Sequence, residues 1–323
     1  MKITIIGTGA YGIALAKTLH LNNNEVSMYT KFEEEAENLN LNHENNKLLP
    51  NVKIPLDIVI TTNLEEALLN SKLIVMAVPS NSVRDASKSL NKYITKNQII
   101  CIVTKGIEIG TLKLMSEVVS EEVECNNICV LSGPSFAGEV AIGAKLGLIA
   151  ASDEINLCNI VKSVFENKNI KVEISNDIIG VQVCASAKNA FAIIMGAINL
   201  QTDSTRATML TILLNDLKQI LNVLGGKSDT IYTYAGIGDF LLTCMNEKSR
   251  NFKFGTILGK GNSVDKCFEI MGITTVEGIY TLNSIYELMK EKNVHIKSID
   301  ILYDVIYNNG SVSKLLCCLG LDL

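Results

Sequence analysis

One lysine stands inside an unusually apolar stretch and is the first candidate for chemistry. Residues 177–200, DIIGVQVCASAKNAFAIIMGAINL, contain Lys188, followed directly by Asn189. A helix that is apolar on every face belongs in a protein core. A buried ammonium there requires a carboxylate or a bound anion, and burial would lower its pKa towards the range useful for proton transfer. Alternatively, its long stem carries the ammonium to the surface.

Two polar groups later in the chain could work with this lysine. Asp239 lies in the apolar segment YAGIGDFLLT (234–243), where it is either a partner for Lys188 or a helix cap. Ser249, Arg250 and Asn251 open a predicted helix. A guanidinium fork, a hydroxyl, an amide and the free N–H groups of a helix together form a phosphate site, although a solvated cap has the same sequence.

The N-terminus carries a glycine pattern, G-x-G-x-x-G, between a predicted strand (Lys2–Ile6) and a predicted helix. Gly7 permits a tight turn, Gly9 lets the backbone approach a pyrophosphate, and Gly12 lets the helix pack on the strand. The phosphates of a ligand would bind the amides at the helix N-terminus. This context predicts dinucleotide binding rather than an ordinary glycine turn.

The end of the second predicted strand bears on the choice of dinucleotide. The strand Glu25–Tyr29 is followed by Thr30 and Lys31 and not by an acid. An Asp or Glu at this place binds the ribose 2′-hydroxyl of NAD and repels the extra phosphate of NADP. The missing acid and the adjacent lysine therefore tolerate or favour NADP, unless Lys31 is simply solvated.

Strands and helices alternate through the first half of the chain. This order predicts an α/β domain over 1–175 with a Rossmann-type, doubly wound parallel sheet, and helical patterns predict an all-α domain over 176–323. The predicted strands are Lys2–Ile6, Glu25–Tyr29, Ile58–Thr61, Leu73–Val78, Gln98–Val103, Cys129–Leu131, Gly147–Ala151 and Lys171–Ile174. Ser80, Lys105, Ser132 and Ser135 follow strand ends, the edge at which such sheets bind ligands.

Composition excludes several classes of protein. The net charge of −5 offers no basic field for nucleic acid, and no continuous apolar run is long enough for stable membrane insertion. The 9 cysteines lack metal-site spacing and are expected to be reduced thiols in the cytoplasm. The N-terminus begins with a strand, leaving no room for a leader peptide. Only 3 histidines are present, so lysine or a carboxylate is the better candidate for proton transfer.

A dinucleotide site, a buried lysine and a phosphate site are what the reduction of a small phosphorylated ketone requires. At this point a family resemblance is evident along the whole chain. The sequence resembles bacterial-type NAD(P)-dependent glycerol-3-phosphate dehydrogenases in an ordered set of motifs: GTGAYG (7–12), NHENNKLLPNVKIP (42–55), AVPSNSVR (77–84), VTKGIE (103–108), LSGPSFAGEVA (131–141), AKNAFA (187–192), YAGIGDFLLTC (234–244), KSRNFKFG (248–255) and TVEG (275–278).

The resemblance implies NAD(P)H-dependent reduction of dihydroxyacetone phosphate to sn-glycerol 3-phosphate for phospholipid synthesis, by a cytoplasmic homodimer that uses NADP or NAD, with NADPH somewhat favoured. Lys188 would be the acid/base group, completed by Asp239 and Lys105. The implied substrate-binding residues are Lys105, Gly133, Ser135, Lys188, Asn189, Asp239, Thr243, Ser249, Arg250 and Asn251. The implied cofactor-binding residues are Gly7, Gly9, Ala10, Tyr11, Gly12, Lys31, Pro79, Lys105, Ala137, Arg250, Val276 and Glu277.

The sequence departs from the family pattern at several positions: Tyr11 replaces a tryptophan, Gln182 and Ser186 replace a glutamate and a small apolar residue, and Ile212-Leu213 replaces arginine-glycine. Two other functions remain open. A related two-domain dehydrogenase acting on a β-hydroxy acid or ketopantoate would recognise a carboxylate and need no phosphate site. A non-catalytic NAD(P) sensor would keep the fold but not the lysine.

Overall fold

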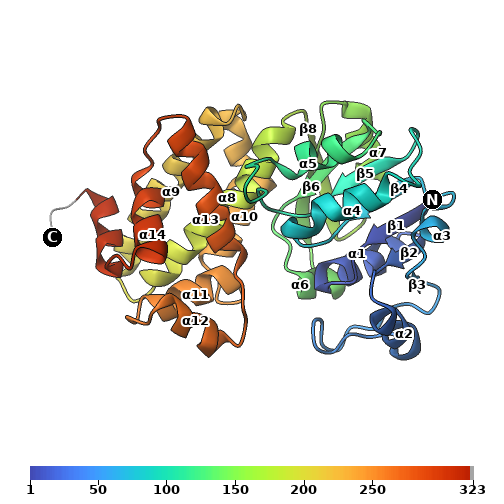
Figure 1. Ribbon diagram of the computed structural model, residues 1–323, viewed down its shortest axis with the longest axis horizontal. Helices are drawn as coiled ribbons and strands as arrows, with labels where there is room; N and C mark the ends of the chain where they lie inside the picture. Colours follow the sequence, from blue (N-terminus) through green and yellow to red (C-terminus); the bar gives the residue numbers. More distant parts are fainter. Residues whose placement is uncertain (321–323) are drawn as a thin grey trace. The chain divides into compact units, whose positions relative to one another are not determined.

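The computed structural model describes residues 1–320, and the chain divides into two compact units (Figure 1). The first unit comprises Met1–Lys105 and Met115–Ile178, and the second comprises Gly106–Leu114 and the chain from Ile179 onwards. The segment Gly106–Leu114 lies within the range 1–175 but packs with the helices. Its residues Ile107 and Leu114 belong to the helical core.

The first unit is built on one sheet of eight strands, and all eight predicted strands are confirmed (Figure 1). Their order in the sheet is β3-β2-β1-β4-β5-β6-β7-β8. Apolar runs such as ITII and LIVM form the central strands, which are covered on both faces. The bounds are β1 Lys2–Ile6, β2 Glu25–Tyr29, β3 Val59–Thr61, β4 Leu73–Met76, β5 Ile99–Ile102, β6 Ile128–Ser132, β7 Leu146–Ala151 and β8 Ile170–Ser175.

The predicted parallel, doubly wound sheet is confirmed, with one antiparallel pairing between β6 and β7. β7 pairs with β6 in antiparallel register, with Leu131 opposite Ala150, and β8 then runs parallel to β7. The connection from β6 to β7 contains only the short helix α6 (Ala137–Ala141). Because this helix packs on α1 (Ala10–Leu21) and does not cross the sheet, the chain re-enters the sheet at the end where β6 leaves it.

Two groups of helices pack on this sheet. Helix α1 contacts α6 and α7 (Ile155–Phe165), whereas α4 (Val83–Leu90) contacts α5 (Met115–Glu122). Figure 1 shows α4 and α5 lying over the strands. Two more helices, α2 (Glu33–Asn42) and α3 (Leu64–Leu68), flank β2 and β3.

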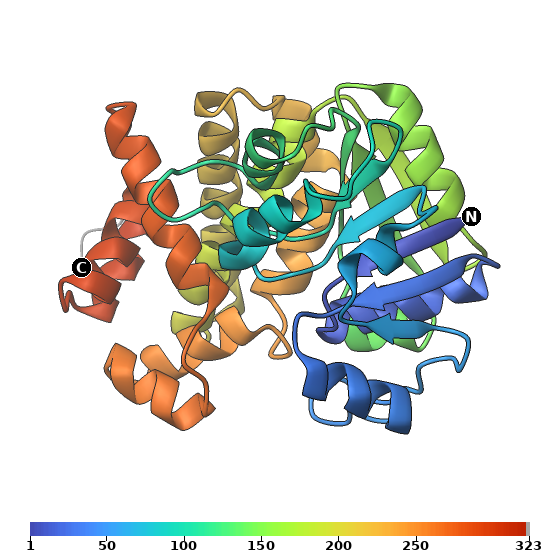
Figure 2. The same ribbon diagram turned by 45° about the vertical axis from the view of Figure 1, so that its right-hand side comes forward.

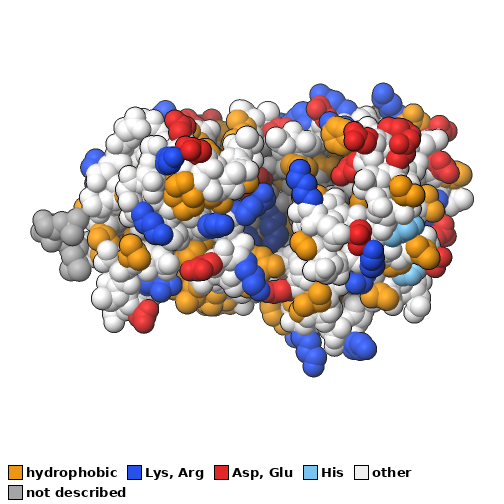
Figure 3. Space-filling model, turned by 90° about the horizontal axis from the view of Figure 1, so that it is seen from below, with side chains coloured by type: hydrophobic (Ala, Val, Ile, Leu, Met, Phe, Trp, Pro, Cys, Tyr) orange, Lys and Arg blue, Asp and Glu red, His pale blue; other side chains and the backbone are white. Residues whose placement is uncertain are grey.

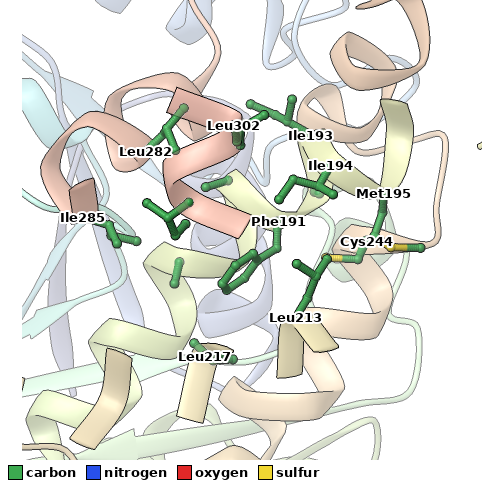
Figure 4. Close-up of a cluster of buried hydrophobic side chains, with 14 of the residues drawn as sticks. Phe191, Ile193, Ile194, Met195, Leu213, Leu217, Cys244, Leu282, Ile285 and Leu302 are labelled. Carbon is green, nitrogen blue, oxygen red and sulfur yellow. The ribbon is translucent and has the colours of Figure 1, made fainter. Parts of the chain in front are cut away.

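The second unit is helical and surrounds α8 (Ile178–Ala197). Helices α13 (Glu277–Glu291) and α14 (Lys297–Tyr307) lie side by side (Figures 1 and 2). Figure 4 shows Phe191 of α8 close to Leu213 and Leu217 of α9. The other bounds are α9 Asp203–Val223, α10 Asp239–Cys244, α11 Arg250–Leu258 and α12 Val264–Met271.

Helix α8 forms the core of this unit. Among the described residues it is the one helix whose length and composition would suffice to cross a membrane, and 89% of its apolar window is buried inside the protein. Two of the departures from the family pattern also lie in apolar surroundings. Leu213 is fully buried in the same core, and Ser186 is 1% exposed on α8.

Charged side chains of both signs are scattered over the face drawn in Figure 3. Ion pairs at the surface of the protein include Lys53 with Glu44 at 2.5 Å and Lys266 with Glu269 at 2.9 Å. Exposed pairs of this kind contribute little to stability because water and salt screen them. An ion pair buried inside one of the units is not screened by water and salt in this way.

Helices α8 and α11 approach each other backbone to backbone through three glycines. A Cβ atom added to Gly255 would lie 2.0 Å from the carbonyl oxygen of Ile193, and one added to Gly196 would lie 2.0 Å from that of Phe252. A Cβ on Gly259, just after α11, would lie 2.1 Å from the carbonyl oxygen of Ala197. No larger residue fits unless the two helices separate.

We therefore expect Gly255→Ala to lower the free energy of unfolding by about 1–3 kcal/mol, because the added methyl group must push α11 away from α8. Denaturant unfolding followed by circular dichroism measures the change. Gly138→Ala is the control, since a Cβ on this exposed helical glycine meets nothing within 4 Å. The control should change stability by less than about 1 kcal/mol, in the stabilising direction. Equal stabilities of Gly255→Ala and the unaltered chain would contradict the packing argument.

Candidate active site

The lysine of α8 is buried and paired. Lys188 Nζ lies 2.5 Å from Asp239 Oδ1, and the two side chains are only 6% and 2% exposed. The carboxylate compensates the charge that the ammonium carries into the protein interior. The alternative in which Lys188 extends to the surface is therefore wrong.

Asp239 reaches Lys188 because of a break in the helix before it. Residues Tyr234–Gly238 form a wide π-helical turn in which Gly236 has non-helical dihedral angles, and α10 begins at Asp239. A Cβ on Gly236 would lie 2.3 Å from the carbonyl oxygen of Ile231, so the turn requires glycine. The residue that caps α10 is Gly238, which makes no side-chain hydrogen bond. The interpretation of Asp239 as a helix cap is wrong.

Two residues of α10 complete the surroundings of Lys188. The ammonium donates a hydrogen bond of 3.0 Å to Thr243 Oγ1. The thiol of Cys244 lies 3.7 Å from the Lys188 carbonyl oxygen, and burial raises the pKa of Cys244 far above its usual range. The thiol thus stays protonated as a donor, and Asp239 is the group that supplies negative charge to Lys188.

A second polar contact joins three helices beside the ion pair. Asn251 Nδ2 of α11 donates to Asn189 Oδ1 of α8 at 3.0 Å, and Asn251 Oδ1 accepts the N–H of Gly278 of α13 at 2.8 Å. Both asparagines are 7% exposed. The amide of Asn251 thereby fixes the N-terminus of α11 against α8 and α13. Gly278 was not among the predicted site residues, although it is the last residue of the TVEG motif (275–278).

The predicted phosphate site lies at the N-terminus of α11. Ser249 is buried and caps the helix, its Oγ accepting the Phe252 N–H at 3.3 Å, so the cap interpretation is correct for this hydroxyl although the cap is not solvated. Arg250 is exposed at the first helical position. At the start of α13, Val276 is buried and Glu277 is the first residue of the helix.

The glycine loop of the sheet unit has the geometry that a pyrophosphate requires. Gly7 has a φ of +114°, and a Cβ there would lie 2.7 Å from the Ala77 carbonyl oxygen. A Cβ on Gly12 would lie 2.5 Å from the Gly7 carbonyl oxygen, whereas one on Gly9 meets nothing within 4 Å. Helix α1 begins at Ala10 and has no acid in its first turn, so its terminal N–H groups suit an anion.

A cavity of about 420 Å³ adjoins this loop. It lies at the carboxyl ends of β1, β2 and β4, where sheets of this type bind nucleotides. Gly7, Gly9, Lys31 and Pro79 of the predicted cofactor residues line it. Glu35 also lines the cavity and was not predicted, because it follows the end of β2 by several residues and returns on the first turn of α2.

Four other predicted residues of the sheet unit, Tyr11, Lys105, Gly133 and Ser135, are joined by hydrogen bonds. Lys105 Nζ donates to the Gly133 carbonyl oxygen at 3.2 Å, and Ser135 Oγ donates to the same oxygen at 3.0 Å. The Tyr11 hydroxyl lies 3.0 Å from Ser135 Oγ, which links the loop of α1 to the segment after β6. Ala137 is the first residue of α6, which packs on α1. The predicted residues of the sheet unit thus lie at two places, beside the cavity and around Gly133.

Comparison with known proteins agrees with this geometry. The models for the N-terminus and the C-terminus of NAD-dependent glycerol-3-phosphate dehydrogenase match residues 2–158 and 177–317. The chain is 36% identical to a glycerol-3-phosphate dehydrogenase [NAD(P)+] from Fusobacterium nucleatum, covering 97% of this chain and 95% of the relative. It is 35% identical to the protein of the same name from Staphylococcus aureus, covering 97% and 96%.

The fold is similar as well. A crystal structure of glycerol-3-phosphate dehydrogenase from Coxiella burnetii superposes with a TM-score of 0.91 at 27% identity, covering 98% of this chain and 97% of that one. The matched family models together span both units, and the curated relatives match nearly end to end. The chain therefore belongs to the family of NAD-dependent glycerol-3-phosphate dehydrogenases.

Proposed function

We propose that this chain catalyses the reversible, NAD(P)H-dependent reduction of dihydroxyacetone phosphate to sn-glycerol 3-phosphate, with Lys188 as the acid/base group. The observation that carries the proposal is the buried pair of Lys188 and Asp239, at 2.5 Å, in a chain of this family. A buried lysine with a fixed carboxylate is a suitable proton donor for a carbonyl oxygen that gains charge.

The roles of the groups around Lys188 follow from their contacts. A nicotinamide bound by the sheet unit would supply the hydride for the carbonyl carbon. Lys188 donates a proton to the oxygen as it becomes an alkoxide, and Asp239 keeps the ammonium charged and oriented. Thr243 fixes the direction of Nζ through its 3.0 Å hydrogen bond. In the reverse direction the same lysine removes the hydroxyl proton.

The substrate phosphate is assigned to the N-terminus of α11. Arg250 supplies a guanidinium, and the helix supplies N–H groups and the positive end of its dipole. Asn251 and Asn189 hold this terminus in place, and their remaining amide hydrogens are further candidate donors. Ser249 caps the helix and positions its first turn.

The sheet unit is assigned to the cofactor. We propose residues 1–175 as the dinucleotide-binding domain and 176–323 as the substrate and catalytic domain. Gly7, Gly9 and the first turn of α1 would hold the pyrophosphate, which fits the glycine geometry. Lys105, Gly133 and Ser135 are proposed as contacts for the substrate or the nicotinamide end, and Val276 and Glu277 as cofactor contacts from α13.

Two further parts of the proposal concern the setting of the enzyme. A cytoplasmic location fits the described cysteines, none of which forms a disulfide. A homodimer is proposed from the family resemblance, and sedimentation measures it. The product is a head-group precursor of phospholipids, which places the reaction in lipid metabolism.

The reaction itself is tested by the loss of NADH or NADPH absorbance after the addition of dihydroxyacetone phosphate. We expect turnover with this ketone and none with ketopantoate or other keto acids, which lack the phosphate. Turnover with a keto acid alone would favour the related β-hydroxyacid or ketopantoate dehydrogenases. Cofactor binding without turnover on any ketone would favour the sensor.

Replacing Lys188 tests the proton transfer. We expect Lys188→Arg to lower kcat by roughly 10²–10⁴-fold with little change in the Kd of the cofactor, because arginine keeps the ion pair but does not release a proton. Turnover assays measure kcat, and calorimetry measures the Kd of the cofactor. Lys188→Ala leaves Asp239 buried and uncompensated, which costs about 3–5 kcal/mol of stability, so the arginine variant is the cleaner test. A kcat close to that of the unaltered chain would make the lysine structural.

Replacing Arg250 tests the phosphate site. We expect Arg250→Ala to raise the KM for dihydroxyacetone phosphate by about 10- to 100-fold with a smaller effect on kcat, because the lost contact is made before and during the reaction. Lys253→Ala is the matched control, since Lys253 is an exposed cation on the same helix. An unchanged KM for Arg250→Ala would place the phosphate elsewhere.

A further inference from the structure

The cavity beside the glycine loop has an acidic lining at the end where an adenosine ribose would lie. Among the described residues that line it, the charged ones are Lys31, Glu35 and Asp85. Thr30 and Lys31 follow directly after β2, the place where nucleotide-binding sheets hold the ribose. The choice between NAD and NADP therefore depends on which of these charged side chains is fixed in place.

Glu35 is fixed by a buried hydroxyl. Thr30 is 5% exposed, and its Oγ1 donates to Glu35 Oε2 at 2.6 Å. Thr30 occupies the strand-end position at which other dinucleotide-binding proteins have an acid. The hydrogen bond brings the carboxylate of Glu35 back to that position from the first turn of α2. A carboxylate accepts several hydrogen bonds, so this contact leaves capacity for a ribose hydroxyl.

The first turn of α2 is held at this place by a second contact. Thr62, just after β3, donates to Glu33 Oε2 at 2.8 Å. Glu33, Glu34 and Glu35 form the whole first turn, and acids are stabilised there by the positive end of the helix dipole. Figure 2 shows α2 next to the strands of the sheet, and α2 contacts β3. Of these three acids Glu35 lines the cavity, and the bond to Glu33 holds the start of α2 beside it.

The one cation at this end is held less firmly. Lys31 is exposed, and its Nζ lies 5.3 Å from the centre of the Phe32 ring, a contact on the surface. A solvated lysine on a flexible stem is a weak partner for a phosphate compared with a fixed guanidinium fork. The expectation that Lys31 favours NADPH therefore rests on the weaker of the two opposing charges.

We propose that Glu35, positioned by Thr30, binds the adenosine ribose 2′-hydroxyl and makes this enzyme select NAD(H) over NADP(H). The hydroxyl donates a hydrogen bond to the carboxylate. The 2′-phosphate of NADP would instead bring a charge of about −2 next to Glu35 and the other acids of α2. The selection goes beyond the dual cofactor naming of the relatives, and it reverses the NADPH preference expected from the sequence.

Binding and turnover of both cofactors test the proposal. Calorimetry gives the Kd of NADH and of NADPH, and assays with dihydroxyacetone phosphate give kcat/KM with each. We expect the unaltered chain to favour NADH at least about tenfold in both ratios. Glu35→Gln should reduce the ratio about tenfold or more, mainly through weaker NADH binding and stronger NADPH binding. Glu35→Arg should reverse it.

The control variant is Glu37→Gln, which removes one exposed carboxylate from the same helix outside the cavity and should leave the ratio unchanged. Thr30→Val tests positioning: NADH affinity should fall while NADPH affinity does not, which a general loss of stability would not produce. An unaltered chain that prefers NADPH, or a ratio unaffected by Glu35→Gln, would overturn the proposal. A binding ratio as expected without turnover would overturn the proposed reaction and leave the cofactor selection standing.

Discussion

The polar groups of the helical unit depend on one constraint, the contact between the backbones of α8 and α11. Because Gly196, Gly255 and Gly259 have no side chains, the helices lie close enough for Asn251 to reach Asn189. That contact sets the start of α11, and with it Arg250 and the helix N–H groups. Because the small residues let the two helices pack closely, the distance between polar atoms on the two helices is fixed. The chemistry of the unit rests on that spacing.

The buried ion pair depends on the same helix. Lys188 occupies one side of α8 while Phe191, Ile194 and Met195 fill the core around it, as Figure 4 shows for the apolar residues. The apolar surroundings lower the local dielectric constant and strengthen the attraction between Lys188 and Asp239. The contacts to Asp239 and Thr243 fix the direction of Lys188 Nζ within these surroundings. A fixed donor needs no reorganisation when charge develops on a carbonyl oxygen.

The sequence predicts features that have a local cause. The apolar runs form the predicted strands, and Gly7 and Gly12 make the close backbone approaches that the glycine pattern predicts. The role of Gly9 towards a pyrophosphate stays a prediction. Features that depend on distant packing were missed or left as hypotheses. The direction of β7 follows from where α6 packs, and the segment Gly106–Leu114 joins the helices through Ile107 and Leu114.

The candidate site likewise combines features with a local cause and features that depend on distant packing. The pairing of Lys188 with Asp239 could be hypothesised, because a buried charge requires a partner, but its distance depends on the π-helical turn before α10. Glu35 was not predicted, because the acid is expected directly at the end of the strand and Glu35 lies in the first turn of the helix that follows. Its approach to Thr30 depends on how α2 lies against β3.

The ion pair also limits how descendants of this chain can change. Loss of either Lys188 or Asp239 leaves an uncompensated buried charge, at a cost of about 3–5 kcal/mol in a fold whose total stability is of the order of 5–15 kcal/mol. Replacing both with apolar residues of similar volume is often neutral. Genetic drift towards an inactive relative therefore favours the joint disappearance of lysine and aspartate, and lineages that retain one without the other should be rare.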